Sequence, residues 1–165
     1  MNGIYLLLGT NLGDRVSNLK MAVSLLQQSG CRVQATSDIY ESEPWGISEQ
    51  PAFLNQVVRA DTLQEPQELL TTLLTIEKEM GRIRHIKWGE RLIDLDILYY
   101  NDLVYRSETL TIPHPEIANR RFTLVPLAEL AAAEVHPGNG LSQARLLEAC
   151  PDKLRVWPLA LPGKR

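Results

Sequence analysis

Two aspartates within one apolar run, Asp94 and Asp96, are the residues whose type and spacing most clearly suggest chemistry. They fall in the segment 92–100, whose β-branched and aromatic residues predict a strand. Because strand side chains alternate between faces, the two carboxylates share one face, roughly 7 Å apart at their Cα atoms. Such a pair of hard oxygen ligands suits Mg²⁺, which completes its shell with water and substrate phosphates.

A cationic segment precedes this strand and contains Arg82, Arg84, Lys87 and Arg91. These are the charges that a polyphosphate needs, and the composition of residues 82–90 suits a loop that closes over a charged ligand. On spacing alone, a solvated face of an amphipathic sheet explains the aspartates as well as a metal site does. Two aspartates on one face repel each other, so a positive charge should compensate them. The neighbouring cationic residues therefore favour the metal site.

An aromatic pair with an amide forms a second candidate site. Trp45 and Phe53 bracket a predicted loop at 41–51, and Asn55 follows Phe53 on the same strand face. This combination suits a flat heteroaromatic ring rich in donors and acceptors. Taken by itself, simple core packing of the two aromatic residues is the better explanation.

His114 lies between two prolines, which restrict its backbone. We expect a restrained, exposed imidazole that donates to a phosphate, or else a turn histidine without a role. Glu77 falls near the end of a predicted helix, where it is either a solvated charge or a residue that faces the site.

The composition is that of one globular domain, which we assign to residues 1–165. The net charge of −3 argues against broad nucleic-acid binding. Two cysteines suggest neither a disulfide framework nor a zinc site, and no apolar run reaches transmembrane length. Without a recognisable signal peptide, a cytoplasmic monomer that binds no membrane is the expectation.

The apolar patterns and turn residues predict an ordered series of elements. We expect strands at 3–8, 32–40, 53–60 and 92–100, and helices from Asp14 to Gly30, from Pro66 to Gly81, at 119–133 and at 141–150. Gly9 to Asp14 is predicted as a tight turn, and 103–105 as a strand that pairs back on 92–100. An edge strand at 154–159 completes the chain. The order β-α-β-β-α-β predicts an α+β, ferredoxin-like core: a mainly antiparallel sheet with helices packed on it, plus a hairpin and C-terminal helices.

Several motifs, in chain order, carry a resemblance to a known family. They are Gly9-Thr10-Asn11-Leu12-Gly13, Pro44-Trp45-Gly46, Phe53-Leu54-Asn55, Arg82-x-Arg84, the run from Trp88 to Leu98, Pro113-His114-Pro115 and Asn119-Arg120-Arg121-Phe122. This set closely resembles the 6-hydroxymethyl-7,8-dihydropterin pyrophosphokinases of folate biosynthesis. The resemblance implies transfer of pyrophosphate from the co-substrate ATP to the pterin hydroxymethyl group, with release of AMP.

The resemblance also implies roles for individual residues. Asp94 and Asp96 would hold two Mg²⁺ ions, and the proton of the hydroxyl would pass to Asp96 or to water. The catalytic set would be Arg82, Arg84, Arg91, Asp94 and Asp96. The ATP-binding set would be Glu77, Arg84, Trp88, Arg91, Ile97, Thr111, His114 and Arg120. The pterin-binding set would be Ser42, Glu43, Pro44, Trp45, Phe53, Asn55 and Phe122, with the two phenylalanines on either side of the ring.

Two residues depart from the family pattern, Glu90 in place of a proline and the bulky Trp45. Two other functions remain open on the residues alone. A two-metal phosphoesterase uses a similar aspartate pair but usually needs more ligands. A ferredoxin-like ligand-binding module needs no metal, but it leaves the four cationic residues unexplained.

Overall fold

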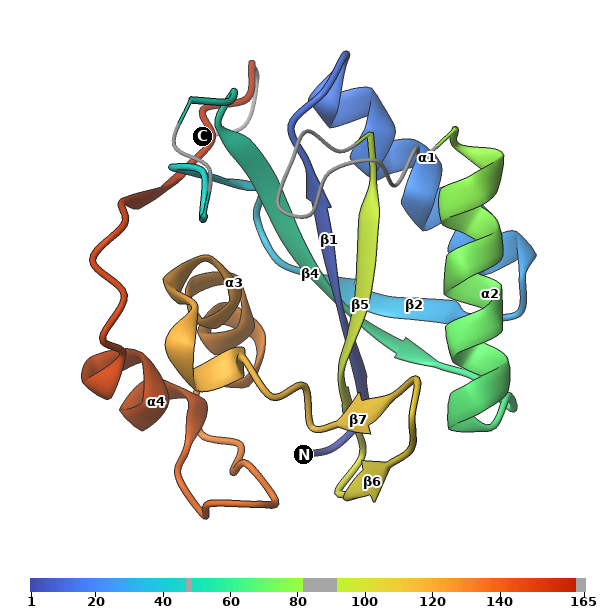
Figure 1. Ribbon diagram of the computed structural model, residues 1–165, viewed down its shortest axis with the longest axis vertical. Helices are drawn as coiled ribbons and strands as arrows, with labels where there is room; N and C mark the ends of the chain where they lie inside the picture. Colours follow the sequence, from blue (N-terminus) through green and yellow to red (C-terminus); the bar gives the residue numbers. More distant parts are fainter. Residues whose placement is uncertain (47–48, 82–91, 163–165) are drawn as a thin grey trace.

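The structure, a computed structural model, describes residues 1–46, 49–81 and 92–162. The predicted cationic loop lies outside the described residues. Within them, the chain forms an antiparallel sheet with helices on both faces (Figure 1).

The sheet runs in the order β5-β1-β4-β3-β8, and β2 also pairs with β4. Its strands are β1 (Ile4–Thr10), β2 (Arg32–Thr36), β3 (Tyr40–Ser42), β4 (Phe53–Asp61), β5 (Asp94–Tyr100) and β8 (Val156–Pro158). All of the pairings are antiparallel. The core order β5-β1-β4-β2 joined through two helices is the ferredoxin-like arrangement, so the predicted fold class is confirmed. Strand β8 at the sheet edge confirms the predicted edge strand.

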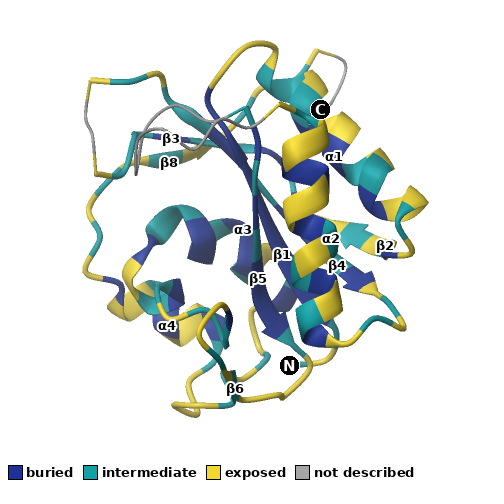
Figure 2. Cartoon of the chain, turned by 45° about the vertical axis from the view of Figure 1, so that its right-hand side comes forward, coloured by how far each residue is buried: buried dark blue, intermediate teal, exposed yellow. Residues whose placement is uncertain are grey.

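Helices α1 (Arg15–Gln28) and α2 (Pro66–Glu79) cover one face of the sheet, and α3 (Arg121–Ala131) and α4 (Gln143–Ala149) cover the other (Figure 1). Each face therefore has its own apolar core. Leu6, Leu8 and Leu95 pack toward α1 and α2, whereas Leu7 and Val57 pack in the core of α3 and α4. In Figure 2 the strands at the centre are largely coloured as buried, and the outer faces of the helices are coloured as exposed.

Local signals in the sequence account for the helix ends. Asp14 caps α1, because its side chain accepts a hydrogen bond of 3.1 Å from the Ser17 N–H. Pro66 opens α2, and Gly81 follows its end with φ +85°, a conformation that favours glycine. These boundaries agree with the prediction.

The predicted strand at 32–40 was wrong, because two short strands, β2 and β3, replace it along β4. Between them the chain leaves the regular ladder at Ser37, whose hydroxyl oxygen accepts from the Val57 N–H at 3.0 Å. A serine side chain competes in this way with backbone pairing. The predicted loop at 41–51 likewise begins later, since β3 extends to Ser42.

The predicted pairing of 103–105 with strand 92–100 was also wrong. Instead β6 (Tyr105–Arg106) pairs with β7 (Thr111–Ile112) in a separate two-stranded sheet. The outer edge of β5 is partly occupied, because the Leu98 carbonyl accepts from the His114 N–H at 2.9 Å. A turn at Asn101 and Asp102 follows β5.

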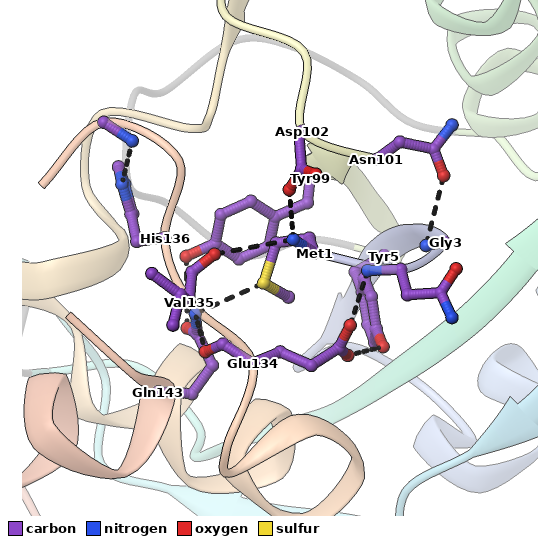
Figure 3. Close-up of polar contacts among 12 residues, drawn as sticks. Met1, Gly3, Tyr5, Tyr99, Asn101, Asp102, Glu134, Val135, His136 and Gln143 are labelled. Carbon is purple, nitrogen blue, oxygen red and sulfur yellow. Dashed lines mark hydrogen bonds and ion pairs between the residues drawn. The ribbon is translucent and has the colours of Figure 1, made fainter. Parts of the chain in front are cut away.

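A polar network closes the end of the sheet that carries the N-terminus (Figure 3). The Glu134 carboxylate accepts from the Tyr5 hydroxyl and from the Asn2 N–H, and the Gly3 N–H donates to Asn101 Oδ1 at 3.1 Å. The candidate functional site lies at the opposite end of the sheet. None of the helices in the described part of the chain has the length and apolar character needed to span a membrane.

Candidate active site

A pocket lies at the end of the sheet where β1 finishes and β4 and β5 begin, on the face covered by α3. The acidic pair and the predicted ring-binding residues converge on it from β3 and the segment after it, from β4 and β5, and from α3. Its lining consists of Leu7, Gly9, Ser42, Glu43, Trp45, Phe53, Asn55, Asp94, Asp96, Arg120 and Phe122.

The two aspartates occupy the first half of the edge strand β5. Both are half-buried, and both line the pocket, as the predicted alternation requires. The residues next to them, Ile93, Leu95 and Ile97, are buried in the core of α1 and α2. The strand therefore separates an acidic face from an apolar one, and two carboxylates are directed into the same cavity.

Gly9 forms the floor of the pocket between Asn55 and Asp94. In the central strand β1 it pairs with Asn55 on one side and with Asp94 on the other. A Cβ atom at this position would lie 3.5 Å from Asn55 Oδ1 and 3.9 Å from Phe53 Cδ1. The prediction of a turn at Gly9 was wrong, since β1 continues to Thr10. A glycine carries no local signal that separates a turn from a pocket floor, so sequence reasoning missed this residue.

The side chain of Asn55 is held in one orientation. It is 2% exposed, and its Nδ2 donates a hydrogen bond of 2.7 Å to the hydroxyl oxygen of Ser42, which is 1% exposed. One of the two N–H groups of the amide is thus engaged within the protein. The carbonyl end is turned toward Gly9 and the pocket.

Aromatic side chains and one buried arginine form the wall opposite the sheet. The guanidinium carbon of Arg120 lies 4.9 Å from the centre of the Trp45 ring and 5.8 Å from that of Phe122. Such distances place a cation over two ring faces. Arg120, predicted as an ATP-binding residue, therefore lines the pocket of the predicted ring-binding residues.

A second, neighbouring pocket shares Asp96 with the first. It is lined by Leu70, Leu95, Asp96, Ile97, Glu108, Thr109, Leu110, Thr111, His114 and Pro115. Three predicted nucleotide-binding residues are among them, namely Ile97, Thr111 and His114. Asp96 thus stands where two cavities of different lining meet.

His114 is half-buried, so the expected exposed imidazole was wrong. Burial, with the nearby positive charge of Arg120, lowers the pKa of His114 to about 4, and the ring is neutral at pH 7. Its Nδ1 accepts from the Glu116 N–H at 3.1 Å, which leaves the proton on Nε2. A neutral ring with a fixed Nε2–H can donate to a phosphate oxygen.

Glu77 is 3% exposed, so it is not a solvated charge. It lies in the last turn of α2, and its Oε1 accepts from the backbone N–H of Leu95 at 2.9 Å. The contact joins α2 to the strand of the two aspartates.

Glu43 on the pocket rim is held by Arg155, the residue before the C-terminal strand β8. Its carboxylate accepts from the Arg155 backbone N–H at 2.7 Å and from Arg155 Nε at 3.0 Å. These hydrogen bonds lower the pKa of Glu43. The predicted Pro44 is not one of the described residues that line this pocket.

Comparison with known proteins identifies the family. A family model described as 7,8-dihydro-6-hydroxymethylpterin-pyrophosphokinase (HPPK) matches residues 5–132. The chain belongs to this family. The match ends before α4 and β8, and β8 pairs with β3 beside the pocket.

Individual relatives agree with the HPPK assignment. The chain is 43% identical over 137 residues to the 2-amino-4-hydroxy-6-hydroxymethyldihydropteridine pyrophosphokinase of Aquifex aeolicus, covering 83% of this chain and 85% of that protein. It is 42% identical over 149 residues to the folic acid synthesis protein fol1 of Pneumocystis carinii, covering 90% of this chain but only 20% of that protein. A Plasmodium falciparum HPPK-DHPS structure with pteroate aligns at a TM-score of 0.71 and 17% identity, over 88% of this chain and 43% of that one. This last similarity shows a shared fold.

The structure thus brings together most of the residues that the resemblance to the HPPK family implied. The first pocket collects Ser42, Glu43, Trp45, Phe53, Asn55 and Phe122 beside both aspartates. Arg82, Arg84, Trp88 and Arg91 lie outside the described residues, as does Glu90.

Proposed function

We propose that this chain transfers pyrophosphate from ATP to the hydroxymethyl group of 6-hydroxymethyl-7,8-dihydropterin and releases AMP. The observation that carries the proposal is the shared position of Asp96, which lines both the aromatic pocket and the neighbouring cavity of Ile97, Thr111 and His114. A pterin in the first cavity and a nucleotide in the second would meet at the acidic pair. Family membership supports the same reaction.

The first cavity has the groups that a pterin needs. Phe53 and Phe122 offer ring faces, and the oriented amide of Asn55 offers an acceptor at the edge of the ring. Ser42 contributes indirectly, because it fixes that amide. The backbone of residues 42–45 would bind the rest of the ring edge.

Asp94 and Asp96 fit Mg²⁺, because they are hard oxygen donors that face one cavity from alternate strand positions. When bound, two Mg²⁺ ions would neutralise phosphate charge and polarise the attacking hydroxyl. The chain's own contribution is to hold both carboxylates on a rigid strand. His114 would donate its Nε2–H to a phosphate oxygen. Arg82, Arg84, Trp88 and Arg91 complete the proposed nucleotide set, with Ile97, Thr111 and Arg120.

The phosphoesterase alternative is less well supported. Among the residues that the structure describes, no group of three or more His, Cys, Asp or Glu side chains is arranged to hold a metal. A two-metal esterase usually relies on such a group. We further propose a single-domain, monomeric enzyme of the cytoplasm that binds neither nucleic acid nor membrane.

The deciding experiment is an assay with ATP, Mg²⁺ and the pterin in which nucleotide products are resolved. AMP formed in equal amount with a pyrophosphorylated pterin supports the proposal. Inorganic phosphate or ADP favours a phosphoesterase or a simple kinase. Binding of the pterin without turnover, and without need for metal, favours a binding module.

A further inference from the structure

The strand that carries the two aspartates is an edge strand, held from outside the sheet at two points. Strand β5 pairs with β1 on one side. On its other side the Leu95 N–H donates to Glu77 Oε1 at 2.9 Å, and the Leu98 carbonyl accepts from the His114 N–H at 2.9 Å. The two contacts lie on either side of Asp96.

The first of these contacts acts on the peptide between the aspartates. Leu95 separates Asp94 from Asp96, and alternate side chains share a face only while the intervening residue keeps its extended geometry. Its amide would otherwise be a buried donor at an unpaired edge, which is costly. A rotation of this peptide would turn the two carboxylates away from each other.

Glu77 is placed to act through the backbone. Its α2 neighbour Ile76 and Leu95 both pack in the core of the sheet face opposite the pocket. Among the described residues Glu77 lines neither the aromatic pocket nor the cavity beside it. A carboxylate that is 3% exposed is expensive to bury, so its hydrogen bond to the Leu95 amide is a specific arrangement.

We propose that Glu77 is a positioning residue, which holds the Leu95 peptide so that Asp94 and Asp96 present a preformed pair of ligands to the metal–nucleotide complex. The inference rests on the proposed function, because it assigns metal binding to the two aspartates. It assigns Glu77 an indirect role in place of direct contact with the nucleotide. Partners one step removed from a metal commonly change its affinity by 10- to 100-fold.

Two substitutions separate the acceptor from the charge. Glu77→Gln removes the charge but keeps an acceptor oxygen at the same reach. Glu77→Asp keeps the charge but withdraws the acceptor by about 1.5 Å, the length of one carbon–carbon bond. Glu79→Gln on the same helix, at an exposed position, is the matched control.

Two measurements on the full chain test the inference without requiring enzymatic turnover. The first is hydrogen exchange of the Leu95 amide by NMR in the metal-free protein, relative to amides of β1. The second is Mn²⁺ affinity in the presence of α,β-methylene-ATP, by electron paramagnetic resonance. We expect Glu77→Asp to speed Leu95 exchange and to weaken Mn²⁺ binding by about tenfold or more. Glu77→Gln and Glu79→Gln should stay within about threefold of the original chain in both.

Several results would overturn the inference. One is unchanged Mn²⁺ affinity in Glu77→Asp, and another is an equal loss in Glu77→Gln, which would make charge the cause. A chain that binds no Mn²⁺ with the nucleotide analogue would also contradict it. The AMP assay is read separately. If Glu77→Asp weakens Mn²⁺ binding as expected but no AMP forms, the positioning role stands and the proposed reaction fails. If AMP forms but Glu77→Asp binds Mn²⁺ as well as the original chain does, the positioning role fails.

Discussion

Asn55 donates its side-chain amide hydrogen to the Ser42 hydroxyl oxygen across a distance of 2.7 Å, and both side chains are buried. Because one amide N–H is engaged by the protein, the side chain is held with its carbonyl oxygen toward Gly9 in the pocket lining. The chemistry offered to a ring edge is therefore set by a residue on the adjacent strand β3.

Ser42→Ala should weaken pterin binding, because it releases the amide of Asn55 and leaves a buried donor unpaired. Loss of one such partner costs about 1–3 kcal/mol, so we expect roughly a tenfold rise in the pterin Kd and a lower melting temperature. Fluorescence titration with the pterin checks this. Ser42→Thr, which keeps the hydroxyl, is the control. An unchanged Kd in Ser42→Ala would show that the amide needs no fixing.

Gly9→Ala should fold but bind the pterin poorly. The new methyl group would meet Asn55 Oδ1 at 3.5 Å and Phe53 Cδ1 at 3.9 Å, which are ordinary contacts, so little destabilisation is expected. It would nevertheless fill the pocket floor between Asn55 and Asp94. We expect KM for the pterin to rise about tenfold or more while KM for ATP changes little, since a displaced ring loses well-placed contacts. Equal changes in both would contradict a role specific to the ring.

Asp96→Asn should abolish most metal-dependent turnover and leave the fold intact. The side chain faces the pocket, and the apolar face of β5 is untouched. We expect a loss of about 10²-fold or more in AMP formation, with pterin binding retained. The metal-free variant should melt at the same temperature or slightly higher, because two like charges no longer share one face. Activity near that of the original chain would show that the metal site lies elsewhere.

Stability should fall as the pH is lowered below about 6.5, in part through His114. The folded-state pKa is lowered to about 4 by burial and by Arg120, so the unfolded chain takes up a proton there before the folded chain does. This group adds at most about 1.4 kcal/mol per pH unit to the slope between those values, and nothing above them.

His114→Asn tests that slope, because an asparagine oxygen replaces the Nδ1 acceptor of the Glu116 N–H without titrating. Urea unfolding at pH 7, 6 and 5 in the presence of a chelator should give a flatter dependence in the variant. Some slope should remain, since burial also lowers the pKa of His136. Parallel curves for the two chains would contradict the assignment to His114.

Arg155→Ala should weaken pterin binding slightly through Glu43. The side-chain hydrogen bond and ion pair are lost, while the Arg155 backbone N–H still reaches the carboxylate. Exposed pairs contribute about 0–1 kcal/mol, so the Kd should rise no more than about fivefold, and less at high salt. Arg145→Ala, at an exposed ion pair on α4, is the control and should have no effect. A salt-independent change would point to altered packing.

Local patterns predicted the helix starts and the aspartate strand, because caps, prolines and alternation are visible within a few residues. The capping by Asp14 and the shared face of Asp94 and Asp96 are of this kind. The break at Ser37 was not predicted, since it depends on a hydrogen bond to a strand twenty residues away.

The site shows the same division. Composition and spacing indicated two separate candidate sites, the acidic pair and the group of Trp45, Phe53 and Asn55. Only the family resemblance placed both in one active site. The floor at Gly9 depends on the register of three strands, and the buried contact of Glu77 depends on how α2 lies on β5. Neither relationship is encoded in neighbouring residues, so neither could be predicted from spacing.

Strand β8 lies against β3, where Val156 pairs with Ser42, and it belongs to the part of the chain beyond residue 132 that the family model does not cover. The rim contact between Glu43 and Arg155 therefore joins a residue inside the matched segment to one outside it. An inhibitor meant to distinguish one relative from another should extend toward Glu43 and Arg155. A compound confined to the aromatic cleft and the acidic pair would meet only residues of the segment that the family model matches.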